Sequence, residues 1–280
     1  MLKQHTVRTI LSLLLSFFLC LSLVGLCIFA EGETAIVGKR NFRDHVKASN
    51  YINAIEKQVN QQVCQLLLNR KVDPACAEEL LNGNRIYVDA FNYINTVFSG
   101  KEGRTQSLEF REGLSSAIKD YLEKNKVSDS ANIDLIIKEI VSQAESYYET
   151  YVTPDFVSTF YAFSNSLNHK LICLAIVSGI LAILILVLLF HMYHSKVHAM
   201  AYLIYAGITA VLINGLIAIS IRNGDFASRL NIGPPSYAAV INEMVRALEK
   251  QCYVVTGIMA GLVVLLISIK QYCKSNLYRK

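Results

Sequence analysis

The stretch LICLAIVSGILAILILVLLF, residues 171–190, runs for 20 residues without a charged side chain. A helix of about 20 apolar residues crosses the roughly 30 Å hydrocarbon core of a bilayer. Three further blocks have the same character, at residues 9–30, 199–221 and 252–269. A soluble helix of this length normally keeps a polar face. The four blocks therefore predict an all-α protein with four transmembrane helices.

The apolar blocks divide the chain into alternating membrane and polar segments. Charged residues make up 18% of the 280 residues, below the roughly 25% of soluble domains, as expected when much of the chain lies in lipid. We expect the following order: N-terminus and first span 1–30, helical domain 31–170, second span 171–190, turn 191–198, third span 199–221, loop and amphipathic helix 222–250, fourth span 251–269 and tail 270–280.

The first apolar block has three interpretations. Lys3 and Arg8 before an apolar run are also typical of a secretory signal, but a signal's apolar region is usually about 7–15 residues and ends at a small-x-small site. Here the run is longer, and the candidate site Ile28-Phe29-Ala30 has a bulky residue, Ile28, where a small one is wanted. We favour a retained helix; the alternatives are a cleaved signal and a lipid-modified Cys27.

The distribution of charge predicts the orientation. The segments 1–8, 191–198 and 270–280 contain Lys and Arg but no Asp or Glu, and all acidic residues lie in the other two polar segments. Basic residues in short loops mark the cytoplasmic side. We therefore expect both termini inside and residues 31–170 outside, as an extracellular helical bundle inserted between spans 1 and 2. The net charge of +5 then reflects membrane topology and anionic lipid rather than nucleic acid.

The segment 31–170 has a helical period. Apolar residues recur every three or four positions, which predicts an amphipathic helix over about 52–66 and others over 85–98, 107–126 and 132–151. Thr153-Pro154-Asp155 is a helix-start pattern, and we expect that helix to run into the second span. A stripe from Tyr237 to Leu248 likewise leads into the fourth span.

Two cysteines, Cys64 and Cys76, lie in the expected outer domain. An oxidising exterior allows a disulfide, which would stabilise the domain by about 3 kcal/mol in the chain-entropy model. Two free buried thiols are the alternative.

The spans offer few polar groups. We expect no Asp, Glu, Lys or Arg within them, although ion-coupled transporters and intramembrane enzymes usually need such groups. Asn214 in the third span is read as a hydrogen-bonding residue for helix cohesion, with a pore role as the alternative. Gly257 and Gly261 form a GxxxG element, which predicts helix packing within the chain or self-association.

The turn HMYHSKVH, residues 191–198, contains three histidines, His191, His194 and His198. On one continuous helix they would share a face and could bind zinc or copper. The segment must reverse the chain, however, which separates them. We favour an interfacial turn, with a metal site and a pH sensor as weaker alternatives.

Residues 91–127, FNYINTVFSGKEGRTQSLEFREGLSSAIKDYLEKNKV, together with the order of the spans, resemble uncharacterised four-span membrane proteins of low-GC Gram-positive bacteria. The resemblance implies a bacterial plasma membrane and no activity, cofactor or residue role.

No catalytic constellation is visible in the sequence, and no cofactor is expected. The first hypothesis is a non-enzymatic cell-surface binding, sensing, scaffold or accessory protein that meets a protein partner or ligand through the outer domain. The alternative is a subunit of an oligomeric channel or transporter, with homo-oligomers in the bilayer.

Overall fold

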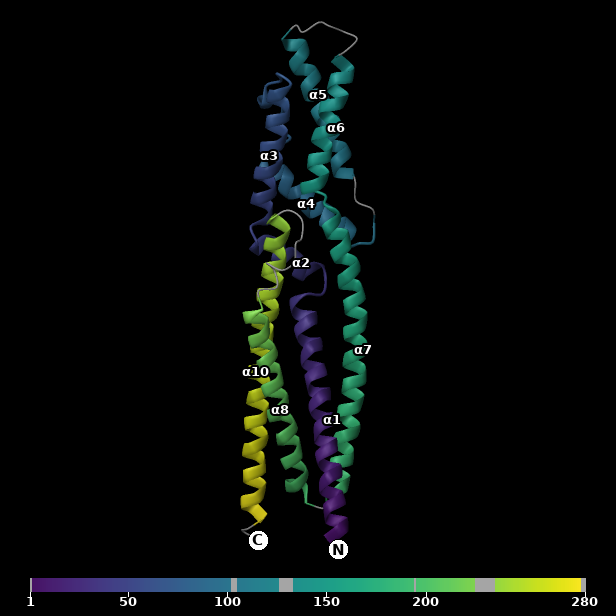
Figure 1. Ribbon diagram of the computed structural model, residues 1–280, viewed down its shortest axis with the longest axis vertical. Coiled ribbons are helices and arrows are strands. Elements are labelled where there is room, and N and C mark those ends of the chain that lie inside the picture. Colours follow the sequence, from purple (N-terminus) through teal and green to yellow (C-terminus); the bar gives the residue numbers. More distant parts are fainter. Residues whose placement is uncertain (1, 102–104, 126–132, 194, 225–234, 278–280) are drawn as a thin grey trace. The chain divides into compact units, whose positions relative to one another are not determined.

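The computed structural model describes residues 2–101, 105–125, 133–193, 195–224 and 235–277, and over these ranges the regular structure is helical (Figure 1). Four helices are long and apolar enough to cross a membrane, as the sequence predicts. They are α1 (Leu2–Ala35), α7 (Asp155–Met192), α8 (Lys196–Asn223) and α10 (Pro235–Leu277). The chain is therefore described as a multi-pass membrane protein.

The chain forms two compact units. One, the membrane unit, comprises residues 1–37, 165–230 and 244–280; the other, the helical unit, comprises residues 38–164 and 231–243. Helices α7 and α10 each begin in the helical unit and continue into the membrane unit. The helical unit therefore includes a short C-terminal segment, residues 231–243, that lies outside the predicted 31–170 domain.

The membrane unit is held together mainly around α1. A buried apolar cluster joins α1, α7 and α8, formed by Leu19, Cys20, Val24, Ala182, Ile185, Leu189, Ala206 and Ala210. Close approach of the helices depends on small residues: a Cβ added at Gly25 would lie 2.4 Å from Ser178 Oγ. Backbones that approach so closely gain packing energy that lipid chains cannot supply.

The helical unit consists mostly of helices that the apolar periodicity predicts. They are α3 (Tyr51–Asn69), α4 (Gly83–Val97), α5 (Thr105–Lys124) and α6 (Ile133–Tyr151). Two elements are additional, the short α2 (Lys39–Ala48) and the 3-10 turn η1 (Pro74–Ala77). The predicted helix start near Thr153 is also found, since α7 begins at Asp155 directly after Pro154.

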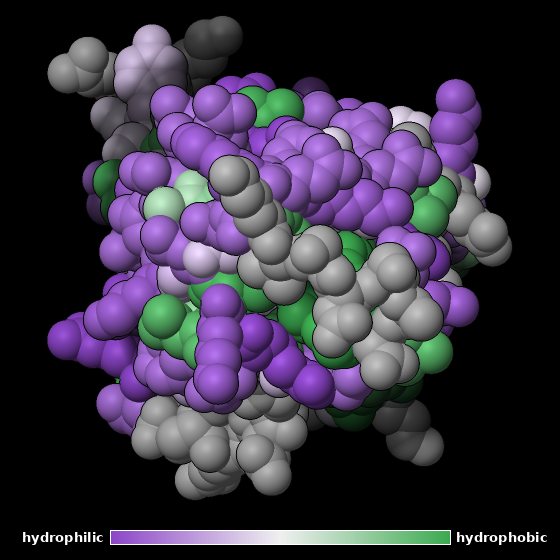
Figure 2. All heavy atoms as spheres, turned by 90° about the horizontal axis from the view of Figure 1, so that it is seen from above, coloured by the Kyte–Doolittle hydropathy of each residue, from purple (hydrophilic) through white to green (hydrophobic). Residues whose placement is uncertain are grey.

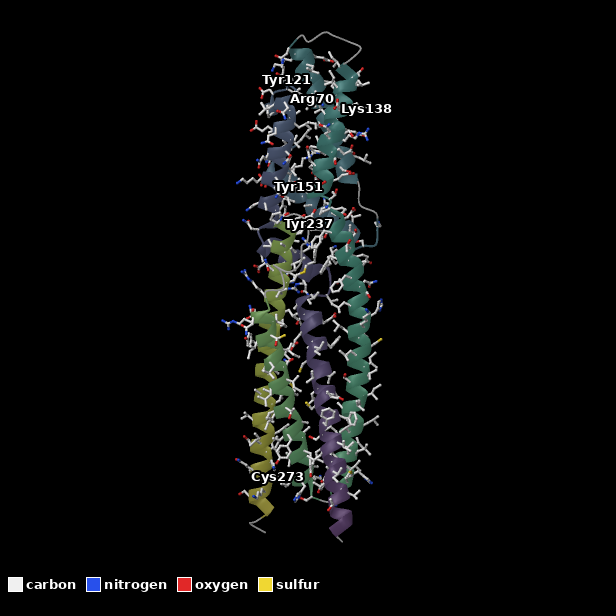
Figure 3. The ribbon with its side chains drawn as sticks, in the orientation of Figure 1. Arg70, Tyr121, Lys138, Tyr151, Tyr237 and Cys273 are labelled. Carbon is white, nitrogen blue, oxygen red and sulfur yellow. The ribbon has the colours of Figure 1, made fainter. Side chains whose placement is uncertain are left out.

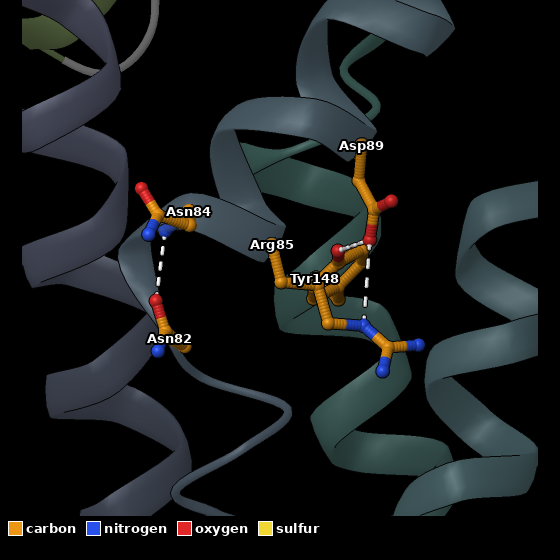
Figure 4. Close-up of polar contacts among 5 residues, drawn as sticks. All are labelled: Asn82, Asn84, Arg85, Asp89 and Tyr148. Carbon is orange, nitrogen blue, oxygen red and sulfur yellow. Dashed lines mark hydrogen bonds and ion pairs between the residues drawn. The ribbon is translucent and has the colours of Figure 1, made fainter.

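Local chemistry fixes several helix starts. The Asn82 side chain accepts a hydrogen bond from the Asn84 backbone N–H at 2.9 Å and so caps α4 (Figure 4). Asp73 caps η1 in the same way through Ala75 N–H at 3.0 Å. Gly38, which precedes α2, has a φ of 95°, a conformation that glycine adopts without a Cβ penalty.

The core of the helical unit is apolar and closely packed. The rings of Phe110 (α5) and Tyr148 (α6) stack with centroids 4.2 Å apart. Phe42 of α2 stacks on Phe160 at 4.6 Å, and this contact anchors α2 to the first turns of α7. The face seen from above in Figure 2 is mainly hydrophilic, as expected for side chains that meet water.

Candidate functional site

A cavity of about 950 Å³ lies in the helical unit beside the corner that joins α6 to α7. It lies wholly within this unit and combines aromatic, hydroxyl and charged side chains. Its lining consists of Tyr93, Val97, Gly100, Lys101, Ser146, Glu149, Thr150, Thr153, Pro154, Asp155, Phe156, Ser158, Tyr161 and Tyr237. Mixed linings of this kind and size are typical of small-ligand sites.

Three tyrosines tie the corner to its surroundings. The hydroxyl of Tyr51 donates to the carbonyl of Tyr151 at 3.1 Å, and that of Tyr93 donates to the carbonyl of Pro154 at 3.1 Å. Tyr237 of α10 donates to the carbonyl of Thr150 at 2.6 Å. The last carbonyls of a helix have no partner within it. Tyr51 and Tyr237 therefore satisfy carbonyls at the end of α6, and Tyr93 binds the corner itself at Pro154, so that together they hold the wall of the cavity in place.

Tyr237 also forms an aromatic wall. Its ring is stacked on Phe156 with centroids 5.0 Å apart and an interplanar angle of 9°. Figure 3 shows Tyr237 at the start of α10 and Tyr151 near it. Burial, followed by the neighbouring Tyr151 and Asp155, raises the pKa of Tyr237 to about 12. The hydroxyl is therefore protonated at neutral pH and remains a donor to the Thr150 carbonyl.

The described lining of the cavity carries more acidic than basic side chains. Glu149 and Asp155 contribute carboxylates and Lys101 contributes an ammonium group. Glu149 accepts a hydrogen bond from Ser107 Oγ at 3.2 Å. Aromatic faces next to carboxylates favour a positively charged ligand, since both attract a cation.

A second polar cluster lies in the membrane unit. Asn214 of α8 donates to Glu31 Oε1 of α1 at 2.7 Å and to Thr256 Oγ1 of α10 at 3.0 Å. The Cys252 thiol donates to Glu31 Oε2 at 3.2 Å. Asn214 thus hydrogen-bonds to two other helices, α1 and α10, and its role in helix cohesion stays a prediction.

Glu31 directly follows the predicted first span, which ends at Ala30, and the four predicted spans themselves contain no acidic residue. Helix α1 nevertheless continues to Ala35, and its Glu31 side chain is only 3% exposed. The signal that could have identified it is Asn214, a costly polar residue in a span that needs a partner.

In the histidine turn, Tyr193 contacts His198. Helix α7 ends at Met192 and α8 begins at Lys196, so His191 and His198 belong to different helices, as predicted. His198 stacks on Tyr193 with centroids 6.1 Å apart. His194 lies outside the described residues. Within the described part of the chain, no three His, Cys, Asp or Glu side chains are grouped so that they could hold a metal ion.

The two remaining predicted pairs lie in different surroundings. A Cβ added at Gly257 or at Gly261 would meet no described atom within 4 Å beyond its own helix backbone, so the GxxxG element does not pack against another described helix. Among the described residues these two glycines therefore show an open face, and self-association through them stays a prediction. Cys64 and Cys76 are free thiols in the structure, with no disulfide between them. Burial, then Asp73, and to a smaller extent Cys64, raise the pKa of Cys76.

Comparison of the chain with protein-family models, with curated proteins and with solved structures found no match.

Proposed function

We propose that this protein is a non-enzymatic receptor or accessory protein of the bacterial plasma membrane that binds a small cationic ligand in the cavity of its helical unit. The observation that carries the proposal is the cavity at the α6–α7 corner, with Phe156 and Tyr237 on one wall and the carboxylates of Glu149 and Asp155 beside them. An organic cation, or a basic side chain of a partner protein, has the chemistry to fill it.

Chain connectivity supports a sensing role. The cavity is lined by the first residues of α7 and by Tyr237 near the start of α10, and both helices continue into predicted spans. A ligand that contacts these residues therefore contacts helices that extend toward the bilayer. In our proposal both termini are cytoplasmic and the helical unit is extracellular, on the basis of the Lys and Arg distribution.

The absence of tryptophan from the sequence gives a direct test. Tyr161→Trp places a single tryptophan, which can be excited apart from the tyrosines, in the lining of the cavity. We expect spermidine or choline to change its emission saturably, and Asp155→Asn and Glu149→Gln to weaken that response. The matched control is Glu139→Gln, because Glu139 is exposed and pairs with Arg70 at 2.6 Å outside the cavity lining. Equal responses in the D155N, E149Q and E139Q backgrounds, or no saturable response to either cation, would refute cation binding at this site.

A second candidate function is a subunit of an oligomeric channel or transporter. It is favoured by the buried Glu31–Asn214 contact and by the open glycine face of α10. Reconstituted vesicles that contain the protein should then pass Na⁺ or protons faster than empty vesicles, and equal rates would reject this candidate.

A further inference from the structure

Two cations lie on one face of α10, directly before the apolar block that begins at Cys252. Arg246 and Lys250 are one helical turn apart and belong to the membrane unit. They line a hollow of about 450 Å³ on this helix. Its described lining consists of Arg246, Glu249, Lys250, Tyr253 and Val254. The hollow therefore places positive charge at the point where α10 enters the predicted span.

The acid in this hollow has a partner of its own. Glu249 Oε1 lies 4.0 Å from Arg222 Nε at the end of α8. Glu243, the next acid on α10, lies one turn further from the apolar block than Arg246. Lys250 forms no ion pair within the ranges that the structure describes. The cluster thus holds three cations and one carboxylate, a net charge of +2, which attracts an anion.

Toward the middle of the span, the same face of α10 becomes aromatic and then smooth. Tyr253 follows Lys250 by three residues and is exposed. Gly257 and Gly261 come next at helical spacing, and a Cβ added at either would meet no described atom within 4 Å. Only 11% of the most apolar window of α10 is buried. Basic and aromatic side chains at headgroup depth, followed by an open apolar face, match the layers of a phospholipid.

A second copy of the chain suits this face less well than a lipid. Copies of one membrane protein insert in the same orientation, so a two-fold contact through Gly257 and Gly261 places Arg246 and Lys250 at the same end of the interface as their own counterparts. Like charges at that end repel. A phosphate group instead accepts hydrogen bonds from both cations, and acyl chains cover the apolar surface beside it.

We propose that Arg246 and Lys250 bind the phosphate of an anionic phospholipid, with Tyr253 at the level of the glycerol backbone and the acyl chains along Gly257 and Gly261. This lipid site goes beyond the proposed function. It is independent of cation binding in the helical unit, and it requires no flux across the membrane.

The first experiment uses quenching of a single tryptophan, since the sequence has none. Tyr253→Trp is made in the full-length protein, which is reconstituted in phosphatidylcholine vesicles with either brominated phosphatidylglycerol or equally brominated phosphatidylcholine. We expect brominated phosphatidylglycerol to quench more strongly at equal mole fraction. The comparison is Tyr205→Trp, because Tyr205 is exposed on α8 and has no cation within one turn of that helix. Its emission should be quenched equally by the two lipids.

Loss of the cations should remove the preference for the anionic lipid. Arg246→Gln and Lys250→Gln in the Y253W background should each weaken the relative binding of phosphatidylglycerol about five-fold. The matched control is R111Q/K119Q, which removes the same two kinds of side chain from exposed positions on α5 of the helical unit. Equal quenching of Y253W by both lipids, or an unchanged preference in R246Q/K250Q, would overturn the proposal.

The second experiment needs no variant and so does not depend on how the changed proteins fold. Native mass spectrometry of the wild-type protein, released from detergent that contains both lipids, counts the phospholipids that stay bound. We expect phosphatidylglycerol to be retained in preference to phosphatidylcholine, and a large excess of soluble glycerol phosphate to leave it in place. Displacement by glycerol phosphate would identify a site for small anions, and equal retention of the two lipids would show no anion site; either result would overturn the proposal. Lipid-free dimers that G257A/G261A breaks would assign the face to a second copy and likewise reject the lipid.

Discussion

The Tyr148 hydroxyl donates a hydrogen bond to Asp89 Oδ2 at 2.5 Å within the core of the helical unit (Figure 4). Tyr148 is fully buried, and its ring stacks on Phe110. Arg85, one turn before Asp89 on α4, lies 3.8 Å from the same carboxylate oxygen. The hydrogen bond joins α4 to α6. Loss of the Tyr148 hydroxyl would therefore leave the buried Asp89 carboxylate without one of its hydrogen-bond donors.

Tyr148→Phe should therefore destabilise the helical unit. The change keeps the aromatic stack but removes one donor from a buried carboxylate, which costs about 1.5–3 kcal/mol for a charge-assisted hydrogen bond. The measurement is the free energy of unfolding from a urea titration followed by circular dichroism. Tyr147→Phe is the matched control, because the neighbouring Tyr147 is only partly buried. Equal stability of the two variants would contradict the role given to the contact.

The same tyrosine predicts a pH dependence at alkaline pH. Burial, and next the hydrogen bond to Asp89, raise the pKa of Tyr148 well above its ordinary value of about 10. The folded state therefore holds the proton more tightly than the unfolded chain. This stabilisation is fully present below about pH 10 and is lost as the pH rises above it. We expect the wild-type protein to lose stability above about pH 10 more steeply than Y148F, as measured by urea titrations at increasing pH.

Sequence reasoning found the amphipathic helices of the helical unit because their apolar stripes are long. It missed α2, whose ten residues KRNFRDHVKA bury little besides Phe42, His45 and Val46. It did not single out Glu31, because an apolar block ends at the first charged residue. Helix α1 nevertheless continues past Glu31 to Ala35. The tyrosines at the α6–α7 corner read as ordinary apolar positions, since the carbonyls that they bind are distant in sequence.

Tyr193, rather than the histidines, should control the stability of the turn between α7 and α8. The Arg8 guanidinium lies 4.2 Å from the centroid of its ring, and its hydroxyl is 2.8 Å from Ser12 Oγ. Tyr193→Ala should lower Tm, since a cation–π contact alone contributes about 0.5–1 kcal/mol at an exposed site and a hydrogen bond is also lost. The variant H191Q/H198Q should change Tm little. Metal analysis of the purified protein gives a separate check, and a metal lost on these histidine changes would restore the metal-site hypothesis.

Cysteine labelling tests the proposed orientation. Burial raises the pKa of Cys64 and Cys76, so their thiols are mostly protonated at neutral pH and should react with maleimide slowly, then faster as the pH rises. In intact cells we expect a membrane-impermeant maleimide to reach Cys64 and Cys76. Cys273, in the predicted cytoplasmic tail, should be labelled only after permeabilisation. Labelling of Cys273 in intact cells would reverse the topology, and failure of both outer thiols to react until a reductant is added would indicate a disulfide.

The effect of a Gly→Ala change in the spans should depend on what surrounds the glycine. A Cβ at Gly207 would lie 2.7 Å from a methyl carbon of Val263, too close to fit unless something shifts, and valine is stiff about χ1. Gly207→Ala should therefore lower Tm of the monomer in detergent. At Gly257 and Gly261 the same change meets open space and should leave monomer stability unchanged. If these two glycines mediate self-association, G257A/G261A should instead weaken energy transfer between donor- and acceptor-labelled copies in vesicles, with G207A as the comparison. A loss of monomer stability in G257A/G261A would show that this face packs within the chain after all.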